Sequence, residues 1–327
     1  MTNSSIDVTG LYTSLSPFNI AILILYAIVV VIGVMGNGLV VIIAWKTISM
    51  HTTANFLLTN VAVADIISLV WCIIPIAFSL SAKHPSGKLG TYICKFFSGY
   101  AMTCISVSVK LSSLLVLAIE RYLAVLRPLE INLHRRQKYI GYRVAFIWIF
   151  AILFSLPGFI YSEYDQRLQR CLDPWTIERV STIKWQITMT IVFLIICSIC
   201  LFYCHIQILK GIFITNTVCS TSSAGTKREN LRAKRTLAIV SFTVTAAYII
   251  CNTPYLVFEI YVAYSEHENI SNKYETLYRI YRVLGFIMYF NSCLNPFLYA
   301  FQSSNYRKNF KRIFCHRETV LNDGNIN

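Results

Sequence analysis

The chain has 327 residues, of which 56% are hydrophobic and only 13% are charged. Soluble globular domains carry about 25% charged residues, so this composition excludes an ordinary water-soluble domain and indicates a membrane protein. The formal net charge of +14 resembles that of nucleic-acid-binding proteins, but its distribution along the chain points to a different origin. No Cys-x-x-Cys pair accompanies a histidine cluster among the 11 cysteines, so we expect no metal site and no cofactor.

Seven apolar segments are long enough to cross a bilayer, which takes about 20 apolar residues in a helix. In chain order they are 18–45, 53–81, 92–124, 140–161, 183–209, 231–263 and 276–300. Each is predicted to be helical because a backbone inside hydrocarbon must satisfy its own polar groups. The predicted fold class is an all-α membrane protein, with a seven-transmembrane helix bundle over 18–300 after an N-terminal tail, 1–17. No internal repeat is evident, which weighs against the runner-up class, a channel or transporter.

An amphipathic cytoplasmic helix is predicted after the bundle, within the segment 301–315. Its apolar side chains alternate with basic ones, a pattern that suits the membrane interface and contact with membrane lipids. The apolar set is Tyr306, Phe310, Ile313 and Phe314, and the basic set is Arg307, Lys308, Lys311 and Arg312. The tail that follows, 316–327, has Thr319 as its only hydroxyl group, so phosphorylation adds little charge there.

Positive charge is distributed unequally between the two sides of the predicted bundle. The segments on one side contain 17 Lys and Arg against 4 Asp and Glu; they are residue 46, 122–143, 210–235 and 303–327. The opposite side contains 10 Lys and Arg against 9 Asp and Glu. Because cytoplasmic loops are enriched in Lys and Arg, we expect a plasma-membrane protein with an extracellular N-terminus, a cytoplasmic C-terminus and no nucleic-acid partner. The glycosylation sequons at Asn3 and Asn269 fall on the predicted outer side, as do Cys94 and Cys171.

Polar and ionisable side chains lie inside the predicted spans, where a charged residue costs about 2.5–3.5 kcal/mol to insert. They are Asn37, Asp65, Lys110, Glu120, Arg121, Asn252, Asn291, Asn295 and Tyr299. Such residues are functional candidates, and we expect a polar column inside the bundle that ends in a charged inner mouth. For Asn37 and Asn291 an alternative stays open, in which they only hold helices together through hydrogen bonds.

Short sequence motifs occur one to a span in a fixed order. Gly36-Asn37 lies in the first span, Asn60-Val-Ala-Val-Ala-Asp65 in the second, and Glu120-Arg121-Tyr122 with Pro128-Leu129 at the end of the third. Trp148, Tyr203 and Pro254 lie in the fourth to sixth spans, and Asn295-Pro296-Phe-Leu-Tyr299 lies in the seventh. Together these motifs resemble those of the rhodopsin-like G-protein-coupled receptors. The run from Asn291 to Phe301 is most similar to the neuropeptide branch of that family, such as the galanin and somatostatin receptors.

The resemblance implies a mechanism with named parts. Arg121 would be paired with Glu120 at rest and would be released toward a heterotrimeric G protein when the sixth span moves outward. Tyr203 and Tyr299 would then contact Arg121, and Leu129 would enter a pocket on the G protein. Arrestin is a further partner that the resemblance implies, and we expect its recruitment through the tail 316–327 to be weak because Thr319 is the only hydroxyl group there.

The resemblance also implies two covalent features. A disulfide would join Cys94 to Cys171, and Cys315 would carry a palmitoyl group, with a free interfacial thiol as the open alternative. Because Cys94 lies two residues farther from Arg121 than is usual in the family, we expect the outer end of the third span to differ.

Lys110 departs from the family pattern, in which a small polar residue at this position stands beside a sodium ion. That ion lies against the aspartate of the second span, here Asp65. We expect a Lys110–Asp65 salt bridge that replaces the sodium ion and favours the resting state, because neither charge is tolerated alone in the interior. Asn252 replaces the usual tryptophan before the proline of the sixth span, and we expect it to join the polar column.

The positions that bind ligands in this family narrow the choice of ligand. Thr103 replaces the aspartate that pairs with amine ligands, and Tyr289 replaces the lysine that binds retinal, so neither ligand is expected. Glu259, Arg279 and Arg282 lie at an outer rim with many charges of both signs, which favours an extracellular peptide. A lipid or other small-molecule ligand stays the alternative. No Ser/His/Asp set, His-Glu-x-x-His motif or Gly-rich phosphate loop points to an enzyme.

Overall fold

The computed structural model describes residues 16–80, 84–99, 101–126, 138–162, 164–166, 170–171, 180–213, 224–265, 273–302 and 304–314. Within them, seven helical stretches are long and apolar enough to cross a membrane. The helices are α2 (Pro17–Lys46), η1 (Ile48–Met50), α3 (Thr53–Leu80), α4 (Gly87–Ile93), η2 (Cys94–Ser98), α5 (Ala101–Leu126), α7 (Ile140–Tyr161), α8 (Val180–Phe213), α9 (Ala224–Tyr264), α11 (Tyr274–Gln302) and α12 (Ser304–Phe314). The two short strands β1 (Tyr164–Asp165) and β2 (Arg170–Cys171) pair antiparallel.

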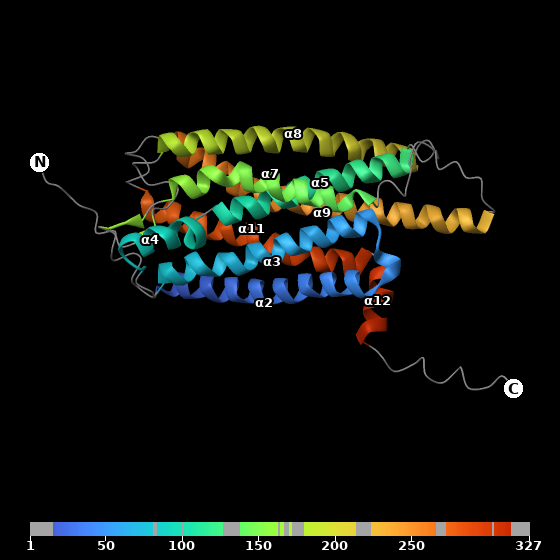
Figure 1. Cartoon of the computed structure of the whole chain (residues 1–327), viewed down its shortest axis with the longest axis horizontal. Helices are drawn as coiled ribbons and strands as arrows, with labels where there is room; N and C mark the ends of the chain where they lie inside the picture. The colour runs from blue at the N-terminus through green and yellow to red at the C-terminus, as the bar shows by residue number, and fades with distance from the viewer. Residues whose placement is uncertain are drawn as a thin grey trace, which may run out of the picture.

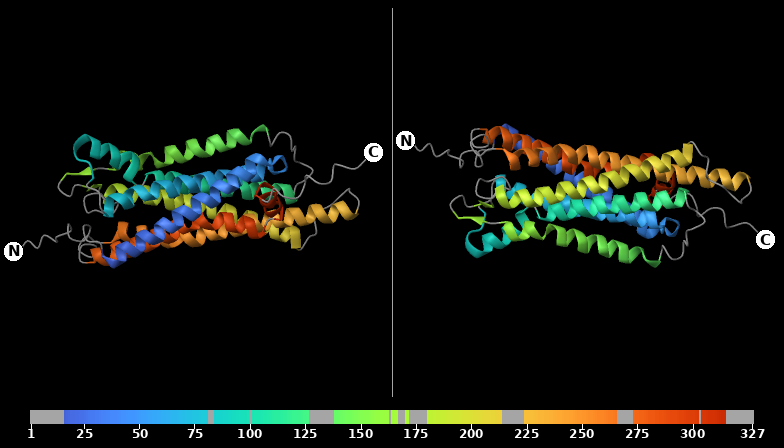
Figure 2. Two further views of the ribbon diagram at one scale, coloured as in Figure 1. Left: turned by 90° about the horizontal axis from the view of Figure 1, so that it is seen from below. Right: turned by 90° about the horizontal axis from the view of Figure 1, so that it is seen from above.

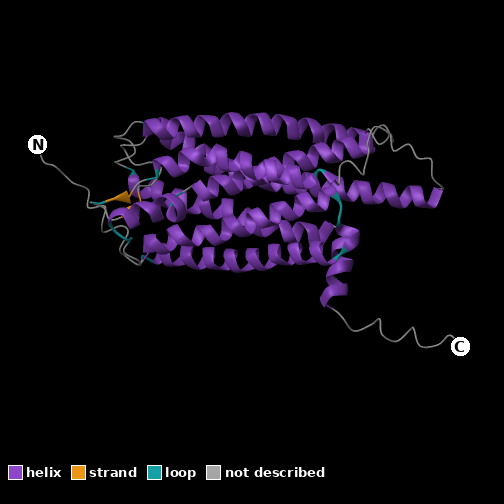
Figure 3. Ribbon diagram, viewed as in Figure 1, coloured by secondary structure: helices purple, strands orange, loops and turns teal. Residues whose placement is uncertain are grey.

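The spanning helices run side by side along the long axis of the molecule (Figure 1, Figure 2). The strands, orange in Figure 3, lie at one end of the bundle, and α12 lies across the bundle axis at the other end. We call these the disulfide end and the α12 end, because a disulfide between Cys94 and Cys171 joins η2 to β2. Helix α5 is central: it packs against α3, α7, α8 and α9, whereas α2 packs against α3 and α11.

Residues of α2 explain where this helix begins and how closely it packs. The side-chain oxygen of Ser16 accepts a hydrogen bond from the backbone N–H of Asn19 at 3.2 Å, which caps the first turn. A Cβ at Gly33 would collide with the side chain of Leu69 and lie 2.8 Å from Sγ of Cys293. The missing side chain of Gly33 therefore lets α2 approach α3 and α11 closely.

The interior and the outer surface of the bundle are both apolar. The largest buried cluster combines Leu57, Leu114, Leu201, Val244 and Tyr299 from five helices. Large apolar side chains also cover the outer surface, as Met35 of α2 does at 70% exposure. A protein surrounded by water rarely exposes such continuous apolar surface, so the spanning helices are built for contact with lipid.

The predicted all-α bundle with seven spans and a terminal amphipathic helix is confirmed, but the third span is not the single helix predicted over 92–124. The chain forms α4 and a π-helical turn, η2, and becomes extended at Gly99 (φ −75°, ψ 167°) before α5 begins. A Cβ at Gly99 would lie 2.5 Å from the carbonyl oxygen of Cys94 and 2.7 Å from Oγ of Ser162, so the break brings three segments into close contact. Whether this end of the third span differs from that of other family members stays a prediction. The strands were not predicted, and α9 begins at Ala224 rather than at 231.

Candidate functional site

A cavity of about 880 Å³, including space open to solvent, lies in the half of the bundle nearer the disulfide end. It is lined by α5, α7, α8, α9 and α11, and more than half of its lining residues are apolar, among them Val107, Phe154 and Leu194. Glu259 is the one charged side chain among the lining residues, all of which the structure describes. A mainly apolar cavity of this size with a few polar groups is typical of a ligand site.

The five ligand-binding residues predicted from the sequence divide between two places. Thr103 and Glu259 line the cavity. Tyr289 adjoins it, because its hydroxyl lies 2.9 Å from Oγ1 of Thr103, within hydrogen-bond distance. Arg279 and Arg282, although within the described part of α11, are not among the lining residues.

Arg279 and Arg282 contact α2 instead of facing the cavity. The guanidinium of Arg279 lies 5.6 Å from the ring centroid of Phe18 and pairs with Glu275, one turn earlier on α11. The guanidinium of Arg282 lies 5.9 Å from the ring centroid of Tyr26. The prediction that both arginines face one pocket with Glu259 is not met, because the sequence did not show how α11 is rotated against α2.

A buried ion pair lies in the middle of the bundle. Nζ of Lys110 is 3.3 Å from Oδ1 of Asp65 and donates a hydrogen bond to Oγ of Ser292 at 3.2 Å. The amide of Asn295 donates to Oδ2 of Asp65 at 2.7 Å. Both charged side chains are almost fully buried, at 2% exposure for Lys110 and 0% for Asp65. The salt bridge expected from the sequence is therefore present, and because the ammonium stands beside the aspartate, these residues do not fit a sodium ion.

The two asparagines whose role was left open are both buried. The amide of Asn37 donates to the carbonyl oxygens of Gly33 at 2.9 Å and Ser292 at 2.7 Å, so it joins α2 to α11. Asn291 is 1% exposed, and its Oδ1 has no hydrogen-bond partner in the described part of the chain. The contacts of Asn37 agree with a role in holding helices together.

Asn252 lies apart from the polar column, contrary to the prediction. Its amide donates to the carbonyl oxygen of Tyr248 at 2.8 Å, one turn earlier on α9, and its side chain lines the cavity. The hydroxyl of Tyr248 donates to the carbonyl oxygen of Val107 at 3.2 Å. The cavity wall on α9 is thus joined directly to α5.

The buried acidic residue near the inner end of the third span has a partner that sequence reasoning missed. Glu120 is buried at 4% exposure and forms an ion pair with Arg143, near the start of α7. The only sequence signal for this pair was a basic residue near the inner end of the fourth span. The pairing of Glu120 with Arg121 stays a prediction.

Two pairs of aromatic residues lie toward the α12 end of the bundle. The rings of Tyr122 and Tyr203 are 6.1 Å apart, and Tyr203 is 53% exposed. Tyr299 is buried, with its ring 6.4 Å from that of Tyr306 in α12, and burial raises the pKa of Tyr306 to about 12. Contact of Tyr203 and Tyr299 with Arg121 in an active state stays a prediction.

Two further contacts join spanning helices to one another. Asn60 donates to Oγ of Ser113 at 2.8 Å and accepts from the indole of Trp148 at 2.9 Å, which joins α3, α5 and α7. A Cβ at Gly36 would lie 2.9 Å from Cγ of Pro296, so α2 and α11 approach each other closely there. Four predicted site residues lie outside the described residues and stay predictions: Leu129, Asn3, Asn269 and Cys315.

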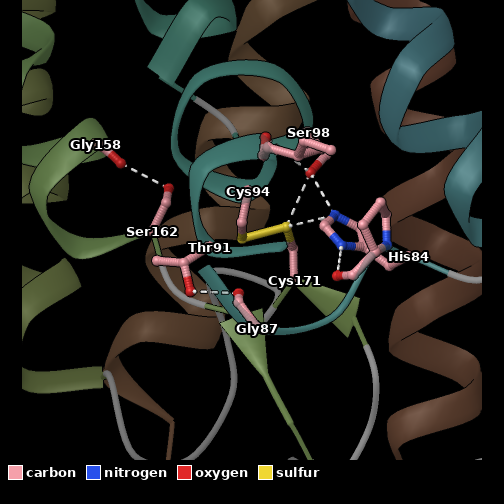
Figure 4. The surroundings of a disulfide bond; sticks show 10 residues. His84, Gly87, Thr91, Cys94, Ser98, Gly158, Ser162 and Cys171 are labelled. Atoms are coloured by element: carbon pink, nitrogen blue, oxygen red, sulfur yellow. Dashed lines mark hydrogen bonds between the residues drawn. A yellow bond between two sulfur atoms is a disulfide. The ribbon is translucent and has the colours of Figure 1, made fainter. Parts of the chain in front are cut away.

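The predicted disulfide between Cys94 and Cys171 is present (Figure 4). Nε2 of His84 lies 3.0 Å from Oγ of Ser98 and 3.3 Å from Sγ of Cys171. The imidazole ring of His84 is tilted against the ring of Tyr164, with the ring centroids 5.2 Å apart. His84 is itself buried, and this burial lowers the pKa of its imidazole below the ordinary value. The disulfide end is therefore held by a compact cluster that the sequence had not indicated beyond its two cysteines.

Comparison with known proteins places these features in a family. The family described as "7 transmembrane receptor (rhodopsin family)" matches residues 36–299. The chain is similar to the type-1 angiotensin II receptor A of Xenopus laevis, at 30% identity over 90% of this chain and 79% of that receptor. It is also similar to somatostatin receptor type 5 of Rattus norvegicus (26% identity, 90% of this chain and 77% of the relative) and to bombesin receptor subtype-3 of Ovis aries (24%, 90% and 75%). The chain therefore belongs to the rhodopsin family of seven-transmembrane receptors, which makes it a multi-pass receptor of the plasma membrane rather than an enzyme.

Proposed function

We propose that this chain is a receptor for an extracellular peptide and that it activates heterotrimeric G proteins through outward movement of α9. The observation that carries the proposal is the cavity at the disulfide end, whose mainly apolar wall contains one carboxylate, Glu259. A peptide supplies matching chemistry, since its apolar side chains fill such a space while an amino group or a basic side chain pairs with the carboxylate. The names of the three relatives support a peptide, because they refer to receptors for somatostatin, angiotensin II and bombesin.

The proposed orientation has the disulfide end and the N-terminus outside the cell. Disulfides persist in oxidising surroundings, and the Cys94–Cys171 bond lies at that end. The excess of Lys and Arg in the segments of the other end supports a cytoplasmic α12. In this orientation the sequons at Asn3 and Asn269 are extracellular and Cys315 is available for palmitoylation from the cytoplasm.

Helix α9 is the proposed route from the cavity to the G protein. It contributes Tyr248, Asn252 and Glu259 to the cavity wall, and it continues past the spanning bundle at the α12 end. A ligand favours one position of α9 only if it makes better contacts in that position than in the other. The hydrogen bond from Tyr248 to the Val107 carbonyl joins α9 to α5, so a shift of α9 must change it. Arg121, Tyr203 and Tyr299 form the proposed coupling surface, and arrestin and membrane lipids are further proposed partners.

A lipid or other small-molecule ligand is the second candidate. The apolar wall formed by Val107, Phe154 and Leu194 favours it, because an alkyl chain or a ring system requires no hydrogen bonds there. The two candidates differ in one chemical property, which is the sensitivity of the ligand to proteases.

The test is nucleotide exchange on a panel of G proteins in membranes that contain the full chain. Peptide extract is added before and after protease digestion. Loss of activation on digestion supports a peptide ligand, and activation that survives digestion moves the assignment to the lipid or small-molecule candidate. An extract that never raises exchange above that of membranes without the chain contradicts the proposed receptor function.

A matched pair of variants tests the role of the cavity in the same assay. Glu259→Gln removes the one carboxylate of the cavity wall, whereas Glu275→Gln makes the same change at an exposed position of α11. We expect Glu259→Gln to reduce the potency of the active peptide by about tenfold or more, since a hydrogen bond to a charged group contributes about 1.5–3 kcal/mol. Equal potency losses in the two variants would contradict binding at the cavity.

A further inference from the structure

Arg282 is a buried cation outside the ligand cavity. Its side chain lies on the same face of α11 as Tyr289, two turns nearer the disulfide end, and Arg282 is only 7% exposed. In the described part of the chain, neither Nε nor Nη2 of this guanidinium has a hydrogen-bond partner, although both atoms are buried. A buried charge without hydrogen bonds is costly, so a guanidinium in this state is suited to receive a group from outside the chain.

Aromatic rings hold the guanidinium in place without using its donors. It lies 5.9 Å from the ring centroid of Tyr26 and 5.7 Å from that of Tyr278, both within cation–π range. The hydroxyl of Tyr26 donates to the backbone carbonyl of Arg282 at 3.3 Å, which fixes α2 against this turn of α11. The contacts position the side chain and leave the N–H groups of Nε and Nη2 available.

The two unpartnered atoms identify the shape of the missing group. Nε and Nη2 form one edge of the planar guanidinium, and their N–H groups point in parallel. Two parallel donors match the two oxygens of a carboxylate, which accepts them side-on in a bidentate pair. A single hydroxyl or carbonyl oxygen can accept from both only through bent hydrogen bonds, so it matches the two parallel donors less well.

The carboxylates on neighbouring elements do not fill this role in the described part of the chain. Glu275, two turns earlier on α11, pairs with Arg279. Glu259 lines the cavity on α9. Arg279 is thus neutralised by its pair with Glu275, whereas neither of these two carboxylates pairs with Arg282.

A chain of contacts joins this position to the cavity. The ring of Tyr26, against which Arg282 lies, is 5.9 Å from the ring of Tyr289. The hydroxyl of Tyr289 lies 2.9 Å from Oγ1 of Thr103, which lines the cavity. Arg282 is therefore linked to the cavity wall through successive contacts with Tyr26, Tyr289 and Thr103.

We propose that Arg282 is a second recognition point of the receptor and takes a carboxylate of the extracellular ligand. The group is the C-terminal carboxylate or an acidic side chain, and it binds side-on to Nε and Nη2 while the rest of the ligand occupies the cavity. The proposal rests on the proposed function, because it assigns a chemical group to that same ligand. It predicts that agonists carry a free carboxylate and that amidation weakens them.

The test uses the purified full chain in phosphatidylcholine nanodiscs, without a G protein. The probes are N-acetyl-L-phenylalanine, which has a carboxylate, and N-acetyl-L-phenylalaninamide, which has the same shape and no charge. Apparent dissociation constants come from the rise of the thermal unfolding midpoint with probe concentration. We expect the acid to bind at least about tenfold more tightly than the amide, because a charge-assisted bidentate pair contributes more than one tenfold step. A ratio near one, or no binding of the acid, overturns the proposal.

Three variants locate the effect. Arg282→Gln should bring the ratio of acid to amide close to one, and Arg282→Lys, which keeps the charge but not the paired donors, should lower it. Lys273→Gln removes an exposed positive charge beside the start of α11 and should leave the ratio unchanged. If Arg282→Gln does not fold, Arg282→Lys decides: an unchanged ratio in that variant overturns the proposal.

Two further arms distinguish the ligand carboxylate from a lipid headgroup and from a failure of the receptor function. Nanodiscs that contain phosphatidylglycerol should leave the affinity for the acid unchanged, and an anionic lipid that removes the advantage of the acid would make a lipid headgroup the occupant and overturn the proposal. If instead the proposed receptor function is wrong, no peptide will raise nucleotide exchange, although the acid will still bind through Arg282. Failure of this inference alone leaves peptide-driven exchange intact and equal for acid and amide forms of the same peptide.

Discussion

Replacing Lys110 by methionine tests whether the buried ion pair stabilises the receptor. The change keeps an unbranched side chain of similar length and removes the ammonium that stands 3.3 Å from Asp65. The carboxylate then remains at 0% exposure with the amide of Asn295 as a hydrogen-bond donor at 2.7 Å. Ser292 also loses the hydrogen bond that it accepts from the ammonium.

The expected loss of stability in Lys110→Met follows from the unpaired carboxylate of Asp65 that the change leaves buried. Removing one partner of a buried ion pair costs about 3–5 kcal/mol, because the other charge stays in a low-dielectric interior. At about 2 °C per kcal/mol for a chain of this size, the thermal unfolding midpoint should fall by about 6–10 °C. Asp65→Asn should be destabilising as well, since it leaves the ammonium of Lys110 at 2% exposure without its counter-charge.

The assay is a double-mutant cycle on purified receptor in nanodiscs, with Lys110→Met, Asp65→Asn and the double variant. The double variant should lose about 2–3 kcal/mol less than the sum of the two single variants, because it contains neither charge. Additive losses, or a midpoint that falls by less than about 2 °C in Lys110→Met, would refute a stabilising ion pair.

A cation series then tests whether the ammonium replaces a sodium ion. The wild-type midpoint should be the same in sodium chloride and choline chloride, because Lys110 already supplies the positive charge beside Asp65. Lys110→Ser should become more stable in sodium than in choline, and its basal nucleotide exchange should rise if the pair favours the resting state. Sodium-dependent stability of the wild-type chain would contradict the replacement of sodium by Lys110.

Variants at three other places in the fold test further contacts. Gly33→Ala should lower the free energy of unfolding by about 1–3 kcal/mol, because the added Cβ overpacks the contact with α3 and α11. Gly38→Ala should raise it by up to about 1 kcal/mol through helix propensity, because its Cβ meets nothing within 4 Å. Thermal unfolding midpoints show whether each variant is less or more stable than the wild type. Arg143→Met should lower the free energy of unfolding by only about 1 kcal/mol, because the side chain of Arg143 is 36% exposed. In a double-mutant cycle, the same change should have no further effect once Glu120→Gln has removed the partner. Burial lowers the pKa of His84 in the folded chain, so the unfolded chain binds the proton more readily. The contribution of His84 to the free energy of unfolding should therefore be fully present above pH 6.5 and should be lost as the pH falls below that value. His84→Gln should remove this pH dependence of stability between about pH 7.5 and 5.

Features with a strong local signal in the sequence were predicted well. The seven spans follow from hydropathy, since a lipid-embedded helix must be apolar along its length. The contact between Lys110 and Asp65 was predicted from the family resemblance, which places Lys110 beside the aspartate of the second span, together with the cost of leaving either charge alone in the interior. The disulfide was predicted from two cysteines outside the apolar core of the bundle, together with the family resemblance.

Features that depend on helix rotation and local backbone geometry were not predictable from the sequence. The partner of Glu120 is Arg143 on α7, and only the packing of α5 against α7 brings them together. The sequence placed Arg282 at the outer end of the seventh span but not on the face that packs against α2. The break at Gly99 carries no periodicity signal, because the residues on both sides of it are compatible with a continuous helix.

The length of helix α9 would allow it to work as a lever. It has 41 residues, of which only Arg235–Tyr264 form the candidate membrane span, so its first part projects beyond the other helices at the α12 end (Figure 1). At about 1.5 Å per residue, the arm from Pro254 to Ala224 is roughly 45 Å long. A rotation of about 10° at Pro254 would therefore displace its end by roughly 8 Å, while the cavity wall near the pivot moves by only a small fraction of that distance. If α9 moves as proposed, its projecting part would amplify a small rearrangement around a ligand into a displacement large enough to open or close a protein-sized docking surface.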